Sequence, residues 1–330
     1  QITNKFYNVP IEKASSENAQ VIEKSDLIMG RIEKYFNRAI SASSINTYLR
    51  CPLDFYYRYI AELGEEKSIE EDIESQQFGS LIHNTLEKLF DKHALLDSLG
   101  NENTPKPNAL EESDLNQMLV DYKELLYNEF LNYFDNESQL FLEGKNLVSY
   151  TIAQDTIENT IKKELEFLKK QSEPFYIVQV EAKKEISLEI LVSGQKKTIH
   201  FKGYIDRIDK IGDSYRVIDY KSGKVKESDV KFKLKDKDLL VSFTNCKHGV
   251  QLALYSLFFK SSFGTYPSEA IIYSLTDVSK IDHKLSYDNH SLADICQLFE
   301  AFIQEVLNEI FNDSSSIDHN EKAKYCNYCQ

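Results

Sequence analysis

The sequence predicts an α/β fold, and three features of the chain support this prediction. Residues 41–171 carry mostly helical patterns, residues 175–222 carry strand patterns, and residues 248–311 give a helix, a strand and a helix. A long helical stretch that precedes a sheet and is followed by alternating elements is typical of an α/β core with a helical insertion. The change from helical to strand patterns comes at Pro174.

The chain of 330 residues is long enough for one large domain or two small ones. Residues 1–40 are polar and weakly patterned, so we expect them to be a lead-in. Because the first residue is Gln1 rather than Met, we also expect the chain to be part of a longer protein. The folded domain should therefore span residues 41–330.

Helices are expected in the first half of this domain. The segment SASSINTYLRCPLDFYYRYI, residues 41–60, begins with helix-capping residues and has a break near Pro52. In FGSLIHNTLEKLF, residues 78–90, apolar residues recur at helical spacing. Residues 114–171 have the pattern of two helices that separate near Gly144.

Strands are expected after Pro174, where β-branched and aromatic residues become frequent. Two later apolar stretches return to the pattern of helices. The predicted strands are residues 175–182, 185–192, 197–211, 215–222 and 269–276, and the predicted helices are residues 248–260 and 291–311.

A tight hairpin is predicted at Gly212 and Asp213, which separate two of these strands. A Gly-X pair between strand-like runs is a hairpin signal, because glycine supplies the positive φ angle that the turn requires. The register that follows gives chemically sensible cross-strand pairs. These pairs are Ile211 with Ser214, Asp209 with Arg216, and Ile208 with Val217.

The same register places Asp206 opposite Asp219, with Lys221 two residues further on the same face. Two directly opposite aspartates, with Cβ atoms about 5 Å apart, repel each other unless a positive charge lies between them. A divalent cation with oxygen ligands meets this need, and Lys221 could then hold an attacking water or stabilise negative charge on a phosphate. The alternative is an exposed strand face on which the lysine simply neutralises the acids.

The stretch from Asp206 to Lys221 resembles the PD-(D/E)xK nuclease motif. Its flanks GYIDRID and VIDYKSGK resemble the RecB-type branch, found at the end of RecB, AddA and AddB helicase–nuclease subunits. Further matches follow in the family's order across residues 41–329. FGSLIH resembles the helix that supplies a histidine ligand, here His83, and QLALY resembles the Gln-x-x-x-Tyr motif, here Gln251 and Tyr255.

This resemblance implies a restriction-endonuclease-like core, with a central mixed sheet flanked by helices and a large helical insertion. It divides the domain into an insertion at about 91–172, a catalytic core at about 174–276, and a C-terminal helix with a cysteine pair at 291–330. It also implies Mg²⁺ or Mn²⁺, with Lys221 assisting water-driven cleavage of a phosphodiester. The implied metal ligands are His83, Asp206, Asp219 and the backbone carbonyl of Tyr220.

Other residues are expected to support this site. Gln251 and Tyr255 lie one helical turn apart and share a face, which suits contacts to the site or to DNA. Gly79, one turn before His83, would leave room for a metal or phosphate. Glu181 is expected at most to support the site from a neighbouring strand. A surface histidine, a core tyrosine and a capping glutamine are the alternative interpretations of His83, Tyr255 and Gln251.

The cysteines fit the same resemblance. The segment around Cys51 and the pair in KYCNYC, Cys326 and Cys329, resemble the iron–sulfur cysteines of these relatives, in which a 4Fe–4S cluster joins the two ends of the domain. The fourth cysteine of the relatives has no counterpart in this sequence. Cys246 or Cys296 could take its place, although Cys296 has the apolar neighbours of a core residue.

Charge and composition limit the partners. The net charge of −14 argues against a general nucleic-acid binder, yet residues 221–247 hold eight lysines and four acids and could form a basic strip or a solvated loop. An odd number of cysteines, five, and the absence of a signal peptide favour a reducing, cytoplasmic setting. No apolar run reaches 18 residues, so no membrane segment is expected.

The resemblance therefore implies a metal-dependent DNA exonuclease domain that acts on DNA ends with a helicase domain or subunit in double-strand break repair. One alternative is a nuclease-like module that has lost activity and serves as a scaffold or DNA-binding element. Such copies usually lose the lysine or an aspartate, and both are present here. A second alternative is a free-standing RecB-like nuclease of the phage or CRISPR-adaptation type, although those chains are normally shorter.

Overall fold

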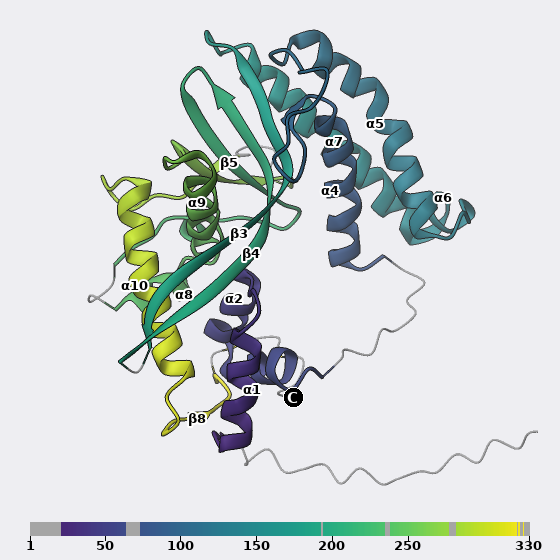
Figure 1. Ribbon diagram of the computed structural model, residues 1–330. Helices are drawn as coiled ribbons and strands as arrows, with labels where there is room; N and C mark the ends of the chain where they lie inside the picture. The colour runs from purple at the N-terminus through teal and green to yellow at the C-terminus, as the bar shows by residue number, and fades with distance from the viewer. Residues whose placement is uncertain are drawn as a thin grey trace, which may run out of the picture.

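A six-stranded sheet forms the centre of the molecule, and helices lie on both of its faces (Figure 1). The computed structural model describes residues 21–63, 73–192, 194–234, 238–276 and 282–321, together with Ala323 and Cys326. The predicted α/β class with a central mixed sheet flanked by helices is confirmed.

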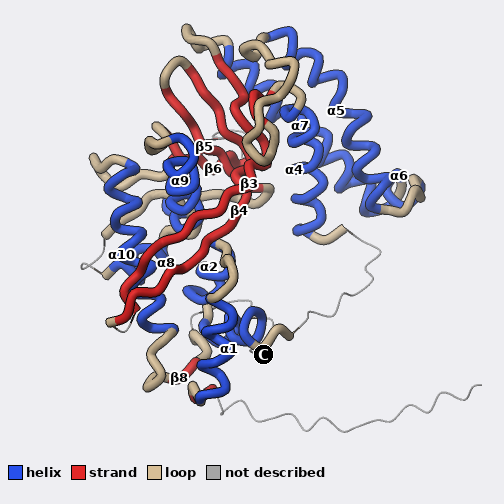
Figure 2. Tube along the Cα trace, viewed as in Figure 1, coloured by secondary structure: helices blue, strands red, loops and turns tan. Residues whose placement is uncertain are grey.

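The sheet mixes parallel and antiparallel neighbours (Figure 2). Its strands, in spatial order, are β2 (Ala94–Leu96), β3 (Phe175–Val192), β4 (Gln195–Ile211), β5 (Ser214–Lys221), β6 (Glu269–Ser274) and β7 (Asp282–Lys284). The β2–β3 and β5–β6 pairs are parallel, and the other neighbours are antiparallel. The long β3–β4 ribbon extends well beyond the rest of the sheet.

The hairpin between β4 and β5 has the predicted register. Ile211 pairs with Ser214, Asp209 with Arg216, and Ile208 with Val217. Gly212 has a φ angle of +55°, in the region that glycine adopts readily, at the turn where it was expected.

Strand β3 differs from the prediction, which had two strands over residues 175–182 and 185–192. Lys183 and Lys184, in the expected gap, stay paired with Tyr204 and Gly203 of β4, so the strand continues without interruption. The two lysines carry no turn signal, and pairing with a long partner strand is sufficient to keep them extended.

Alternate residues of the strands face two separate cores. One core, around Ile218 and Tyr273, packs against α4 (Ser75–Asp91), α5 (Glu112–Tyr133), α6 (Gln139–Leu142) and α7 (Gly144–Leu168). The other core, around Val217 and Ile272, packs against α2 (Ala42–Arg50), α8 (Leu239–Asn245), α9 (Gly249–Phe263) and α10 (Leu292–Ile310). Helix α7 begins at Gly144, the point where a break between helices was predicted.

The N-terminal segment is more structured than a lead-in. Helix α1 (Asp26–Phe36) lies within residues 1–40, and it buries Ile32, Tyr35 and Phe36 in the core that contains α2. The short strand β1 (Ile22–Glu23) pairs with β8 (Ser316–Ile317), so the two ends of the described chain meet. The helical spacing of apolar residues in α1 covers only three turns, which explains why the sequence did not predict this helix.

Two local details complete the fold. Cys51 has an extended backbone between α2 and α3 (Pro52–Phe55), which is the break expected near Pro52, and a π-helix, η1 (Tyr56–Ile60), follows. The lysine-rich stretch 221–247 is not one loop, because it contains a short 3-10 turn, η2 (Glu227–Asp229), and α8. Within the described ranges, every helix is too short or too polar to cross a bilayer.

Candidate active site

The two predicted aspartates meet at the end of the β4–β5 ladder. The last β4–β5 pair is Arg207 with Ile218, and Asp206 and Asp219 lie one step beyond it. Both carboxylates are buried. Asp206 Oδ2 accepts a hydrogen bond of 2.7 Å from the backbone N–H of Tyr220, which ties β4 to β5 where regular pairing ends.

Helix α4 brings His83 to the same place. Its Nδ1 lies 3.5 Å from Asp206 Oδ2, and its Nε2 lies 3.0 Å from the backbone carbonyl oxygen of Tyr220. Burial lowers the pKa of His83, so the neutral imidazole that binds metals is favoured. Three of the predicted ligand groups are therefore adjacent, although His83 and Tyr220 are far apart in sequence.

Gly79 makes this approach of α4 possible. A Cβ atom on Gly79 would lie 2.8 Å from the Oγ of Ser222, which directly follows β5. Side chains do not pack at that distance, so an alanine at this position would require the Ser222 hydroxyl to turn away, whereas the glycine accommodates the helix without any shift. Space for a metal or phosphate was expected beside Gly79. Ser222 Oγ lies in part of that space, and Gly79 also lines the cavity at this end of β5.

Lys221 and Gln251 hold opposite sides of the Asp219 carboxylate. Lys221 Nζ lies 2.6 Å from Asp219 Oδ2, and Gln251 on α9 donates a hydrogen bond of 2.7 Å to Asp219 Oδ1. The same Gln251 nitrogen lies 2.9 Å from the hydroxyl oxygen of Tyr255, one turn further along α9. The predicted Gln-x-x-x-Tyr pair thus supports an aspartate of the site.

Electrostatics show an excess of negative charge in this cluster. Burial, and next the charge of Asp219, raise the pKa of Asp206 well above its usual range. Burial by itself would lower the pKa of Lys221, but Asp219 and Asp206 outweigh it and the pKa of Lys221 is raised. Lys221 is therefore a protonated cation at neutral pH, and it alone does not offset the two acids.

Glu181 adds a third carboxylate to the site. It lies next to His83 and Asp206, whereas the sequence predicted at most a supporting position for it. An oxygen of Glu181, a nitrogen of His83 and an oxygen of Asp206 all lie within 4.8 Å of one another, close enough to share one metal ion. Burial, then the charges of Glu87 and Asp219, raise the pKa of Glu181 to about 7. Its backbone φ of +46° is a strained conformation for a residue with a side chain, and such strain is concentrated at functional sites.

These groups open onto a cavity of about 460 Å³ between α4 and the end of β5. His83, Glu181, Tyr220 and Lys221 line it. Oxygen and imidazole ligands around a partly open site suit Mg²⁺ or Mn²⁺, which keep some positions for water and substrate. The cavity can therefore admit a phosphate next to Glu181 and Lys221.

A buried network of ion pairs supports the strands that carry the site. Arg207 forms ion pairs with Asp209 and with Glu164 of α7 at 2.9 and 2.7 Å, and donates a hydrogen bond of 2.9 Å to the hydroxyl of Tyr220. Arg216 contacts the other side of Asp209. The network fixes both the strand that carries Asp206 and the residue whose carbonyl faces His83.

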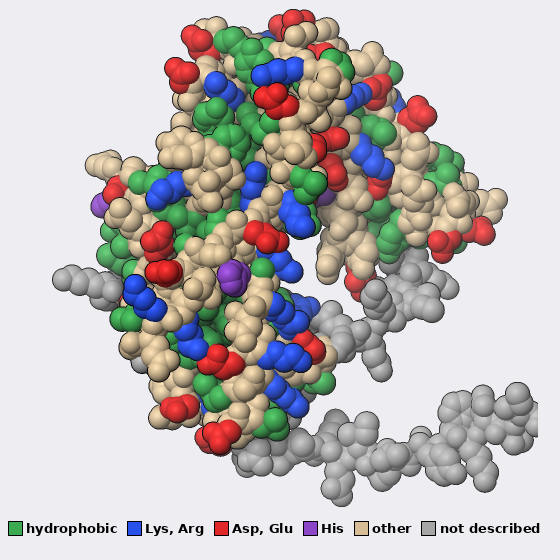
Figure 3. All heavy atoms as spheres, viewed as in Figure 1, with side chains coloured by type: hydrophobic (Ala, Val, Ile, Leu, Met, Phe, Trp, Pro, Cys, Tyr) green, Lys and Arg blue, Asp and Glu red, His purple; other side chains and the backbone are tan. Residues whose placement is uncertain are grey.

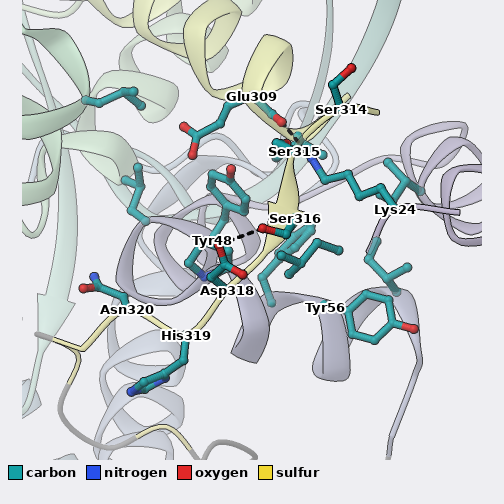
Figure 4. A pocket seen from close by; sticks show the side chains of 18 of the residues that line it. Lys24, Tyr48, Tyr56, Glu309, Ser314, Ser315, Ser316, Asp318, His319 and Asn320 are labelled. Atoms are coloured by element: carbon teal, nitrogen blue, oxygen red, sulfur yellow. Dashed lines mark hydrogen bonds between the residues drawn. The ribbon is translucent and has the colours of Figure 1, made fainter. Parts of the chain in front are cut away.

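A second cluster of metal-binding groups joins the two ends of the domain. Ligand atoms of Cys51, His319 and Cys326 lie within 4.8 Å of one another, with 3.3 Å between Cys51 Sγ and His319 Nδ1. Burial alone would raise the pKa of the Cys51 thiol, but hydrogen bonds from the backbone of Asn320 and Asp54 and from His319 lower it, which favours the thiolate. His319 borders a cavity of about 630 Å³ between the N-terminal helices and the C-terminal segment (Figure 4).

The structure places two of the other three cysteines away from this cluster. Cys329 lies outside the described residues. Cys246 and Cys296 are buried in the core, where burial raises the pKa of each thiol to about 12, and in the described part of the chain neither joins a group of metal-binding residues. The suggestion that one of them supplies a further ligand is therefore wrong for the described residues, and His319, which sequence reasoning missed, lies there instead. No spacing signal links His319 to Cys51, because 268 residues separate them.

A family model and two solved structures resemble this chain. The family model for the PD-(D/E)XK nuclease superfamily matches residues 39–330. Among solved structures, a protein of Eubacterium rectale named as a candidate exonuclease is 15% identical, with 91% of this chain and 90% of that chain covered and a TM-score of 0.43. A protein named SSO0001 is 18% identical, with 68% and 85% covered and a TM-score of 0.22. No curated protein matches the sequence.

Proposed function

Because the chain belongs to the PD-(D/E)XK nuclease superfamily, we propose that it is a metal-dependent deoxyribonuclease that hydrolyses phosphodiester bonds at DNA ends. The observation that carries the proposal is the convergence of His83, Asp206, Asp219 and the Tyr220 carbonyl beside Lys221. A structural role for this cluster is unfavourable, because buried acids with raised pKa values destabilise a fold unless a cation offsets them.

The residues fit a divalent cation. His83, Asp206 and Glu181, whose donor atoms lie within 4.8 Å of one another, would hold it together with the Tyr220 carbonyl. Asp219, whose oxygens contact Lys221 and Gln251 in the structure, would complete the set. These groups offer the oxygen and imidazole donors that Mg²⁺ and Mn²⁺ accept. When bound, the ion supplies Lewis-acid activation of water and charge neutralisation at the phosphate.

The side chains contribute further chemistry of their own. Lys221 is held as a cation by Asp219, so it stabilises the negative charge that develops on the phosphate rather than acting as a base. Gln251 orients Asp219 through its hydrogen bond to Oδ1. Tyr255 in turn fixes the Gln251 amide.

The wider setting follows the resemblance found in the sequence. We infer that the domain acts on DNA ends with a helicase domain or subunit in double-strand break repair. We also infer that Cys51, Cys326 and Cys329 bind an iron–sulfur cluster, and the lowered pKa of Cys51 supports its role as a thiolate ligand. A free-standing nuclease of the same superfamily would use the same catalytic residues.

The test is degradation of end-labelled single-stranded and duplex DNA with Mg²⁺, Mn²⁺ or EDTA. We expect metal-dependent cleavage by the wild-type chain, its loss in Lys221→Ala, and its retention in Lys224→Ala, which removes a nearby exposed lysine. Absence of cleavage in all three proteins, each shown to be folded and to bind Mn²⁺, would favour the alternative of an inactive scaffold.

A further inference from the structure

An exposed aromatic residue lies on the strand that carries Asp206. Tyr204 is two residues before Asp206 on β4, and 52% of its surface is exposed. Large aromatic side chains are normally buried because removing their surface from water is favourable. An exposed tyrosine beside a candidate phosphodiester-cleaving site is therefore available to contact a ligand.

The neighbours of Tyr204 fix the direction in which it points. A Cβ atom on Gly203 would lie 3.0 Å from the Phe258 ring of α9, and Ile205 is fully buried in the core that contains α9. Successive side chains of a strand alternate between faces, so Tyr204 and Asp206 project from the opposite face. Asp206 indeed contacts His83 of α4 on that side. Tyr204 therefore lies about 7 Å along the same face from Asp206.

Two exposed lysines accompany the tyrosine. Lys183 of β3 pairs directly with Tyr204, and Lys202 is two residues before Tyr204 on the same face of β4. Among the described residues, neither lysine forms an ion pair, although Glu185 is the cross-strand partner of Lys202. Figure 3 shows Lys and Arg side chains gathered along the border of the hollow between the body of the molecule and α4.

We propose that Tyr204, Lys183 and Lys202 form a subsite for single-stranded nucleic acid next to the candidate active site. The tyrosine ring stacks on an unpaired base, and the two ammonium groups contact phosphates of the same strand. This combination of an aromatic platform and nearby cations is what sequence-independent single-strand binding requires. Bases in a duplex are already stacked on each other, so the platform favours an unpaired strand.

The proposal extends the proposed nuclease function, and binding without cleavage tests it separately. The probe is a fluorescein-labelled oligothymidylate of about 15 nucleotides, with anisotropy measured in EDTA. Stacking on one base is worth about 1–3 kcal/mol, so Tyr204→Ala should weaken binding by about 5- to 150-fold. Tyr204→Phe keeps the ring and should bind like the wild type.

Matched controls separate stacking from general effects. Tyr133→Ala removes another partly exposed tyrosine, 40% exposed on α5, and should leave binding unchanged. Lys183→Ala and Lys202→Ala should each reduce the slope of log affinity against log salt concentration by about 0.7. Thermal melts of each variant show whether it is folded.

Several outcomes would overturn the subsite. These are no binding of the single strand by the wild type, wild-type affinity in Tyr204→Ala, or an equal loss of duplex affinity in that variant. If Tyr204→Ala weakens single-strand binding while neither the wild type nor the variant cleaves DNA, the subsite stands and the nuclease proposal fails. If the wild type cleaves DNA and Tyr204→Ala binds and cleaves equally well, the nuclease proposal stands and the subsite fails.

Discussion

Gln251 donates a 2.7 Å hydrogen bond to Oδ1 of Asp219, across the gap between α9 and β5. The contact leaves the other carboxylate oxygen to Lys221. An aspartate held in this way keeps its carboxylate in one orientation beside the candidate metal site.

Loss of this contact should weaken metal binding. We expect Gln251→Leu to raise the Mn²⁺ concentration needed for half-maximal cleavage by about 10- to 100-fold. Tyr255→Phe removes only the hydroxyl that touches Gln251 and should have a much smaller effect. Calorimetric titration with Mn²⁺ measures affinity independently of activity, and equal affinities in Gln251→Leu and the wild type would contradict the role given to Gln251.

The raised pKa of Glu181 predicts a pH-dependent stability in the absence of metal. Its pKa is near 4.3 in the unfolded chain and about 7 in the folded one, so the folded state binds more protons between these values. This contribution therefore makes the metal-free protein less stable as pH rises from about 4.5 to 7.

The variant Glu181→Gln removes this contribution. In EDTA at pH 8 we expect it to be more stable than the wild type in urea denaturation, with the difference shrinking towards pH 4.5. Added Mn²⁺ should stabilise the wild type more than the variant. Glu185→Gln changes an exposed carboxylate on the same strand and serves as the control. A pH-independent difference between Glu181→Gln and the wild type would refute the assignment.

The close approach of α4 to the end of β5 can be tested at Gly79. Gly79→Ala forces a clash with Ser222 Oγ and should displace His83, reducing the cleavage rate by about 10- to 100-fold. The double variant Gly79→Ala with Ser222→Ala removes the clashing oxygen and should recover most of that loss. Gly223→Ala, where an added Cβ meets open space, should act like the wild type. Failure of the double variant to recover would show that the clash is not the cause.

The buried ion-pair network around Arg207 should contribute more to the stability of the fold than an exposed ion pair does. Arg207→Met leaves Glu164 without its cation in the core and Asp209 with Arg216 alone, so we expect a loss of about 3–5 kcal/mol in the free energy of unfolding. Arg38→Ala breaks an exposed ion pair with Glu62 and should cost far less stability, because solvent screens such pairs. Urea denaturation of both variants gives the comparison, and similar losses would contradict it.

The cysteine cluster predicts which residues retain a metal. We expect Cys51→Ala, Cys326→Ala and His319→Ala each to lower the iron or zinc content per chain, measured by mass spectrometry after anaerobic purification. Cys296→Ala alters a core cysteine and should retain the wild-type metal content. An unchanged metal content in His319→Ala would limit the site to cysteine ligands.

Local signals in the sequence determined the β4–β5 register and the helices around the site. The Gly212–Asp213 turn fixes which residues face each other, because a two-residue hairpin has one register, and this brought Asp206 and Asp219 to the same end of the ladder. Apolar spacing likewise located α4, which carries His83, and a nearly continuous apolar stretch located α9, which carries Gln251.

Tertiary packing alone decided the rest. The contact between His83 and the Tyr220 carbonyl joins residues 137 positions apart, and it depends on how closely α4 packs on the sheet. The strained backbone of Glu181 and the position of His319 beside Cys51 leave no periodic trace in the sequence. Turn and helix signals act over a few residues, whereas these contacts arise from burial and pairing between distant segments, and those interactions are defined only in the folded chain.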